Sequence, residues 1–194
     1  MTVVKLTENE SVFCQALAMT TLLSSLIENR FLDSDYYKNM PFTNNESNCR
    51  KILEASSLGN PATLQMYLYI LLVMPNEVLQ LAETCYLEGL QKEFNVLIAK
   101  DIDGFQTTYN NEVETDLTGI NFYRHIRNAV AHSRCSYHLI DGKNYVLFTD
   151  VDFRDVTQYC KIKIATSKLG HFINFLQIQM MNYLNTKWNK HSCE

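Results

Sequence analysis

Apolar residues recur every three or four positions along most of this 194-residue chain, which is the spacing of helices that bury one face. Glycine (6 residues) and proline (3 residues), which interrupt helices, are scarce. The hydrophobic share of 46% excludes a chain that is disordered throughout. We therefore expect a mainly α-helical protein, and its length predicts a single domain over residues 1–194.

Two local signals predict where helices begin. Thr7 and Glu10 have the spacing of a capping box, which predicts a helix over residues 8–30. Asn60 suits a helix cap, and Pro61 suits the first helical position because proline has no N–H to leave unsatisfied. The helix predicted after them, residues 61–74, is apolar on nearly every side and is expected to be the central core helix.

A segment near the C-terminal end departs from the helical pattern. Asp141 and Gly142 separate two alternating runs, residues 135–139 and 144–148, which predicts a β-hairpin. A further strand is expected at residues 159–164, so the insertion spans Cys135 to Ile164. A last long helix follows, and the tail from about Lys190 is expected to fray. The acidic segment before the hairpin, residues 100–116, shows little periodicity and is predicted to be a loop.

The sequence also bears on location and cofactors. We find no apolar run of the roughly 20 residues that a membrane span needs, and the N-terminus lacks the apolar core of a secretory signal. The six cysteines lie far apart without metal-ligand spacing and are expected to be reduced thiols. These features predict a cytoplasmic protein with no membrane contact, no metal and no cofactor.

Positive charge is concentrated in one part of an acidic chain. The net charge is −4, but residues 117–140 contain no Asp or Glu and carry +3, which leaves −7 for the rest. This window holds three arginines and three of the five histidines: Arg124, Arg127, Arg134, His125, His132 and His138. Such a window suits a phosphate or another anion. The alternative is ordinary solvated charge on a helix face.

The spacing of polar residues in this window indicates a more specific chemistry. Arg124, Asn128 and His132 form an i, i+4, i+8 row opposite the apolar face of a predicted helix, and Arg127 lies beside the row. A histidine exchanges a proton near neutral pH, and an arginine fork holds a phosphate and stabilises added negative charge. Asn128 is placed to orient the imidazole. The alternative is that His132 only caps the helix C-terminus or interacts with its dipole.

These residues carry a resemblance to a known family. The segment Ile-Arg-Asn-Ala-Val-Ala-His at residues 126–132 resembles the Arg-(x4 to 6)-His signature of the HEPN superfamily, including the polar residue after the arginine. Gly59-Asn60-Pro61, Ser133-Arg134 and the hairpin before the last helix are similar to a plasmid- and defence-associated branch. The resemblance implies a HEPN-like helical bundle with a small β-hairpin inserted before the last helix. It also implies a homodimer in which two motif helices face one another.

The resemblance implies a function as well. Many HEPN proteins are metal-independent endoribonucleases that act as toxins or abortive-infection effectors, so the implied partners are RNA and an antitoxin protein. Arg127 and His132 would be the catalytic pair, with Asn128 in support. Their positively charged neighbours would contact RNA phosphate: Arg124, Arg134 and His125.

One departure from the family pattern and two alternatives accompany this interpretation. In the branch paired with nucleotidyltransferase antitoxins, a tyrosine two positions after the histidine is modified, whereas this chain has Arg134 there, which argues against that control. The first alternative is a HEPN-like module that binds RNA, a nucleotide or a partner protein without chemistry. The second, a helical DNA-binding regulator, is disfavoured by the acidic charge and by the absence of a short basic recognition helix.

Overall fold

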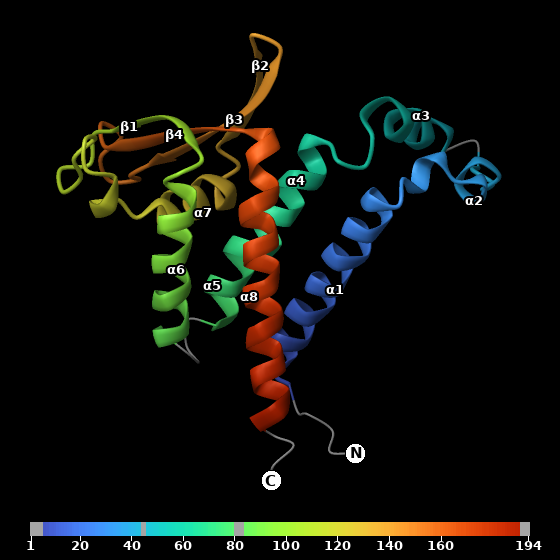
Figure 1. Ribbon diagram of the computed structural model, residues 1–194, viewed down its shortest axis with the longest axis horizontal. Helices are drawn as coiled ribbons and strands as arrows, with labels where there is room; N and C mark the ends of the chain where they lie inside the picture. The colour runs from blue at the N-terminus through green and yellow to red at the C-terminus, as the bar shows by residue number, and fades with distance from the viewer. Residues whose placement is uncertain (1–5, 44–45, 80–83, 191–194) are drawn as a thin grey trace.

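The computed structural model describes residues 6–43, 46–79 and 84–190, and helices make up most of it, as expected. Figure 1 shows α8 running through the middle of the molecule, with α1 crossing it on one side and α6 beside it on the other. The helices are α1 (Glu8–Glu28), α2 (Asp35–Lys38), α3 (Ser47–Ser56), α4 (Pro61–Leu68), α5 (Met74–Leu79), α6 (Thr84–Ile98), α7 (Phe122–Ala131) and α8 (Leu169–Lys190). Since α8 is helical to Lys190, the frayed tail expected from there falls on residues 191–194, which lie outside the described residues.

Both predicted helix starts are confirmed. The Thr7 hydroxyl accepts a hydrogen bond from the Glu10 N–H at 3.2 Å, and the Glu10 carboxylate accepts one from the Thr7 N–H at 2.9 Å. Asn60 Oδ1 accepts a hydrogen bond from the Thr63 N–H at 3.0 Å, with Pro61 at the first helical position. These local hydrogen bonds satisfy donors that have no partner inside their own helix.

The central core helix differs from a regular α-helix in one turn. Between α4 and α5 the chain forms a π-helical turn over Tyr69–Val73, most of which is buried. Pro75 follows directly, and in a regular α-helix its ring would clash with the carbonyl of Leu71 four residues earlier. The wider π turn accommodates the proline, so the helix continues into α5 without a break.

The strands form a four-stranded antiparallel sheet, which is larger than the small hairpin expected. Its strands are β1 (Ile102–Thr107), β2 (Cys135–Ile140), β3 (Lys143–Val151) and β4 (Tyr159–Ala165), in the order β1-β4-β3-β2. The prediction of a loop over residues 100–116 was therefore wrong for its first part. Strand β1 pairs with β4, and Phe105 packs edge-on against Phe122 of α7 with ring centroids 5.5 Å apart. The acidic composition of this segment suggested a loop. The strand accommodates Asp103 because its carboxylate is paired with Lys168 at 2.6 Å.

Every second side chain of β3 points to the face of the sheet that packs against α7. Val146, Phe148 and Asp150 occupy every second position and are all buried, because this face of the sheet packs against α7. The first two extend the hydrophobic core. The third brings a carboxylate to the same buried face, beside the helix that carries Arg127 and His132.

Helix α1 passes a test of length and composition for a membrane span. It has 21 residues and contains an 18-residue window with a mean hydropathy of 1.3. Its residues Phe13, Leu17 and Thr20 are buried against neighbouring helices, whereas Met19 and Leu22 are exposed. Core helices of soluble proteins pass the same test of length and composition.

Candidate functional site

The motif helix α7 is fixed at its start by two asparagines. Asn121 caps it through a hydrogen bond from the Arg124 N–H to Oδ1 at 3.0 Å. Asn95 of α6 accepts a hydrogen bond from the Tyr123 N–H at 2.8 Å, which ties the first turn of α7 to a neighbouring helix. The predicted apolar face is confirmed, since four of its members are fully or almost fully buried: Phe122, Ile126, Ala129 and Val130.

The end of α7 is a Schellman motif centred on Ser133. The Arg134 N–H donates to the Ala129 carbonyl at 2.7 Å, and the Ser133 N–H donates to the Val130 carbonyl at 3.2 Å. Ser133 has φ of 54°, a left-handed conformation that glycine usually adopts at this position. The backbone therefore closes the helix, and the His132 side chain is not needed as a cap. Within the described residues, the exposed imidazole has no hydrogen bond or ion pair.

Arg127 lies on another side of the same helix. It is half-buried, and its guanidinium forms no hydrogen bond or ion pair with any residue that the structure describes. Five positions separate it from His132, which corresponds to about 140° around an α-helix. The two side chains of the predicted catalytic pair therefore leave α7 in different directions, and a single chain does not bring them into one cleft.

A hollow of about 380 Å³ lies along the side of α7 that carries His132. From the predicted set, the structure brings four residues to its wall: Arg124, Asn128, His132 and Arg134. Its opposite wall is formed by the end of β3 and the loop after it, through Val151, Asp152 and Phe153. Arg127 and His125 do not line it. The structure therefore groups four of the six predicted site residues, two catalytic and two phosphate-binding, on one concave surface.

His125 is in the interior, so the prediction that it contacts RNA phosphate is wrong. Its side chain is 0% exposed, with Nδ1 2.7 Å from Oδ2 of Asp150 and Nε2 2.7 Å from Oε1 of Glu112. An imidazole donates to two carboxylates only when both nitrogens carry protons, and otherwise one carboxyl must hold the proton. His125 thus joins the loop before α7 to strand β3, and its role is to position the helix.

Asp150 is the centre of a hydrogen-bond network beneath the hollow. Its Oδ2 accepts hydrogen bonds from His125, from the Asn128 amide at 3.1 Å and from the Tyr109 hydroxyl at 3.3 Å. Burial alone would raise the pKa of Asp150, but the hydrogen bonds from His125 and Asn128 outweigh it and hold that pKa below its ordinary value. Burial and the Asp150 charge raise the pKa of Tyr109. Asn128 is therefore held by its Nδ2, which leaves Oδ1 to face the hollow or His132.

Glu112 completes the network from the loop after β1. Its side chain is 3% exposed, and it accepts a hydrogen bond from the Thr107 hydroxyl at 2.8 Å as well as one from Arg124 at 3.3 Å. Arg124 also lies over the Tyr109 ring at 5.4 Å, with 41% of its own side chain exposed. The negative charges of Glu112 and Asp150 are thus balanced by Arg124 and by the proton that they share with His125, because a buried charge is costly unless it is paired. The sequence analysis missed Glu112, Asp150 and Tyr109. The available signal was the β3 alternation, which directs a carboxylate inward.

One group of side chains in the network has the composition of a metal site. Glu112, His125 and Cys160 offer ligand atoms that all lie within 4.8 Å of one another. Both ring nitrogens of His125 already contact carboxylates, and burial raises the pKa of the Cys160 thiol, so the thiolate that a metal requires is disfavoured. The hydrogen bonds explain this group without a metal ion.

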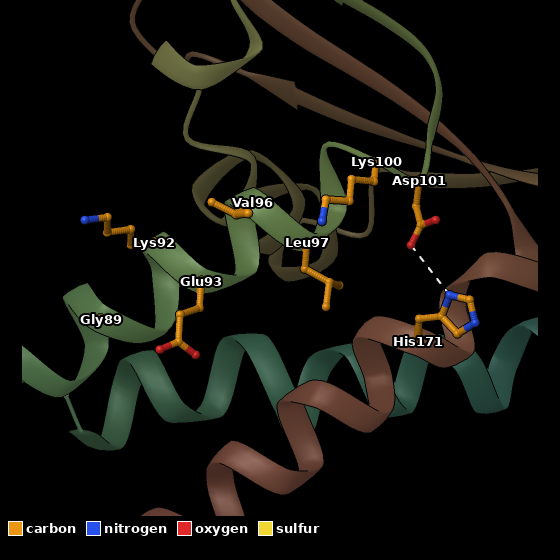
Figure 2. A pocket seen from close by; sticks show the side chains of 8 residues that line it. All are labelled: Gly89, Lys92, Glu93, Val96, Leu97, Lys100, Asp101 and His171. Carbon is orange, nitrogen blue, oxygen red and sulfur yellow. Dashed lines mark ion pairs between the residues drawn. The ribbon is translucent and has the colours of Figure 1, made fainter.

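A larger hollow, of about 770 Å³, lies between α6 and α8, away from the motif helix. Figure 2 shows His171 of α8 facing Asp101, with 3.8 Å between Nδ1 and Oδ2, while Val96 and Leu97 of α6 supply alkyl surface. This ion pair is exposed on the histidine side. This hollow contains none of the predicted motif residues, although its volume is larger. We therefore assign the candidate site to the smaller hollow beside α7, which contains His132 and Asn128.

Comparison with known proteins gives a match at the level of the family. A family model described as HEPN pEK499 p136 matches residues 5–187, which is nearly the whole chain. No curated protein and no solved structure matched.

Proposed function

Because this chain belongs to the HEPN family described as pEK499 p136, we propose that it is a metal-independent endoribonuclease. The observation that carries the proposal is the state of the two motif side chains. The half-buried Arg127 and the exposed His132, on two different sides of α7, have no hydrogen bond or ion pair to the described residues, whereas Asn128 between them is tied into the Asp150 network. Groups that a fold leaves unpaired beside an ordered network are candidates for contact with a substrate.

In the proposed reaction His132 removes the proton of a ribose 2′-hydroxyl as that oxygen attacks the adjacent phosphorus. The P–O bond to the 5′-oxygen breaks, that oxygen takes a proton from water and His132 returns its proton to water, so the products are a 2′,3′-cyclic phosphate and a 5′-hydroxyl. Arg127 stabilises the additional negative charge on the phosphorane-like transition state. Asn128, anchored to Asp150 at 3.1 Å, is placed one helical turn before His132 to orient its imidazole.

A second copy of the chain completes the cleft in this proposal. Arg127 and His132 diverge by about 140° on α7, so one helix does not direct both at the same phosphate. Two α7 helices related by a two-fold axis would bring the arginine of one copy near the histidine of the other. We further propose that the protein acts as a toxin or abortive-infection effector in the cytoplasm, and that an antitoxin protein restrains it.

The test is cleavage of mixed single-stranded RNA by the wild type and by H132A and R127A. Both variants are expected to lose activity with unchanged thermal unfolding, and a chelator is expected to leave the wild-type rate unchanged. Matched controls are H138A, because His138 is an exposed histidine on β2, and R30A, because Arg30 is in an exposed ion pair with Asp33. Both controls should cleave like the wild type.

Two results would contradict the proposal. One is a wild-type protein that cuts no RNA at any concentration, while H132A binds RNA as tightly as the wild type does, which would favour the HEPN-like binding module. The other is activity that survives in both H132A and R127A. Strong affinity for duplex DNA that falls steeply with salt would instead support the DNA-binding regulator.

A further inference from the structure

The loop after β3 presents an aromatic side chain at the edge of the hollow beside α7. Phe153 is 82% exposed, and it lines this hollow together with His132 and Arg134. A phenyl ring in water forgoes the favourable free energy of burial. An exposed ring that lines the same hollow as the proposed catalytic histidine is therefore a candidate ligand contact.

The loop that carries Phe153 is ordered by its own hydrogen bonds. Asp152 Oδ1 accepts from the N–H of Arg154 at 2.7 Å and from the N–H of Asp155 at 3.3 Å. The Asp152 N–H donates to the Gln158 carbonyl at 3.0 Å, which closes the two ends of the loop. The loop backbone that carries the ring is thus ordered before any ligand arrives, which lowers the entropy that binding must overcome.

The surroundings of the ring suit a planar, uncharged group attached to a phosphate. The Arg154 guanidinium lies over the ring at 5.0 Å from its centroid, and the high exposure of Phe153 leaves the opposite face open. Arg134, which also donates to the Val151 carbonyl at 3.0 Å, and the partly exposed Arg124 line the same hollow and supply positive charge for phosphate. The volume of about 380 Å³ lies within the range of small-ligand pockets, roughly 300–1,000 Å³.

We propose that Phe153 is the stacking platform for one unpaired base of single-stranded RNA, next to the phosphodiester held at His132. The inference rests on the proposed function, since it takes RNA as the ligand of this hollow. Aromatic side chains recognise unpaired bases by stacking, whereas bases in a duplex stack on one another and do not reach such a ring. The site would therefore select single-stranded over duplex RNA.

The experiment measures the binding of a fluorescein-labelled single-stranded oligoribonucleotide to H132A protein, which keeps the RNA intact. Adding Phe153→Ala is expected to weaken binding roughly tenfold, as the loss of one stacked base predicts. Phe153→Trp should keep the affinity, because indole also stacks. Val156→Ala is the matched control, since Val156 is 74% exposed on the same loop and does not line the hollow. It should bind like the parent, and an oligomer with abasic positions should bind H132A and H132A/F153A equally.

The outcomes separate this inference from the proposed function. If the wild type cuts no RNA but F153A still weakens binding, the result supports the stacking site and contradicts the nuclease proposal. If H132A abolishes cleavage but F153A binds RNA like its parent, the result contradicts the stacking site and supports the nuclease proposal. The stacking site is also contradicted if no variant binds single-stranded RNA, or if F153A changes the oligomeric state instead of RNA affinity, which would make Phe153 a protein contact.

Discussion

Oδ2 of Asp150 lies 2.7 Å from Nδ1 of His125, and this contact fastens the end of β3 to the middle of α7. The same oxygen accepts a hydrogen bond from Asn128, which stands one turn before His132 on the outer side of the helix. A buried carboxylate from the sheet therefore fixes both the helix and the residue next to its free histidine. The orientation of the candidate site depends on β3 as much as on the motif.

Replacement of Asp150 tests how much this anchor contributes to stability. D150A leaves the buried His125 and the Asn128 amide without their acceptor, and removing one partner of a buried pair costs about 3–5 kcal/mol. The free energy of unfolding in urea should fall by that order, and by less in D150N, which keeps an acceptor oxygen. D33A is the control, because the Arg30–Asp33 pair is exposed and contributes about 0–1 kcal/mol. Equal stability of D150A and wild type would contradict the anchoring role.

Acid should weaken the protein through the same carboxylate. The folded-state pKa of Asp150 lies below its ordinary value of 3.8, so its contribution to stability is present above about pH 4 and is lost as the pH falls through the folded pKa. We expect the urea midpoint of the wild type to drop between about pH 4 and pH 2, and the drop in D150N to be shallower. An equal drop of the urea midpoint in the two proteins would show that Asp150 does not contribute to the loss of stability in acid.

The local parts of the site were predictable from the sequence, and the anchoring parts were not. The apolar spacing of α7 is a property of ten consecutive residues, so its buried face and its exposed His132 follow from the chain itself. His125 looks like a surface residue on that helix, because its two partners come from elsewhere. Glu112 lies in a segment without periodicity. Asp150 continues the alternation of buried residues along β3, but the sequence does not show that α7 packs against that face.

Strand β1 was missed for a related reason. Among the described residues it pairs with β4, more than fifty positions later, so the pairing depends on distant residues and not on the composition of the segment. Asp103 made the segment look like a loop, although its carboxylate is paired with Lys168. Arg127 shows a different limitation of local patterns, since the helix places it away from the hollow, and the proposed cleft therefore includes a second chain.

The left-handed residue at the end of α7 predicts a stabilising substitution. Ser133 has φ of 54°, where an L-residue is strained and glycine is not. S133G should raise the free energy of unfolding by about 0.5–1 kcal/mol, because relief of this strain exceeds the entropy that glycine adds to the unfolded chain. S133A keeps the Cβ atom and should give no increase, which makes it the matched control. A lower urea midpoint in S133G would contradict this account of the helix end.

The cysteines should differ widely in reactivity. Cys49 and Cys85 are exposed, whereas Cys160 is buried and its burial raises its pKa. Burial also raises the pKa of Cys135 to about 11. Because the thiolate is the reactive form, N-ethylmaleimide at pH 7.5 should label the two exposed residues first and label Cys135 and Cys160 only after unfolding. Peptide mapping by mass spectrometry resolves each site, and rapid labelling of Cys160 in native protein would contradict its position under the sheet.

Mixing two inactive variants tests whether the cleft is shared between copies. R127A retains its histidine and H132A retains its arginine, so a mixed dimer contains one intact pair only if a site draws its two residues from different chains. After subunit exchange at equal concentration, about half of the dimers are mixed and each holds one intact site of two, so activity should recover to about a quarter of the wild-type value. R127A mixed with the double variant R127A/H132A is the control and should stay inactive. No recovery in the first mixture, together with a proven mixed dimer, would place both residues in a site formed within one chain, against the divergence of Arg127 and His132 on α7.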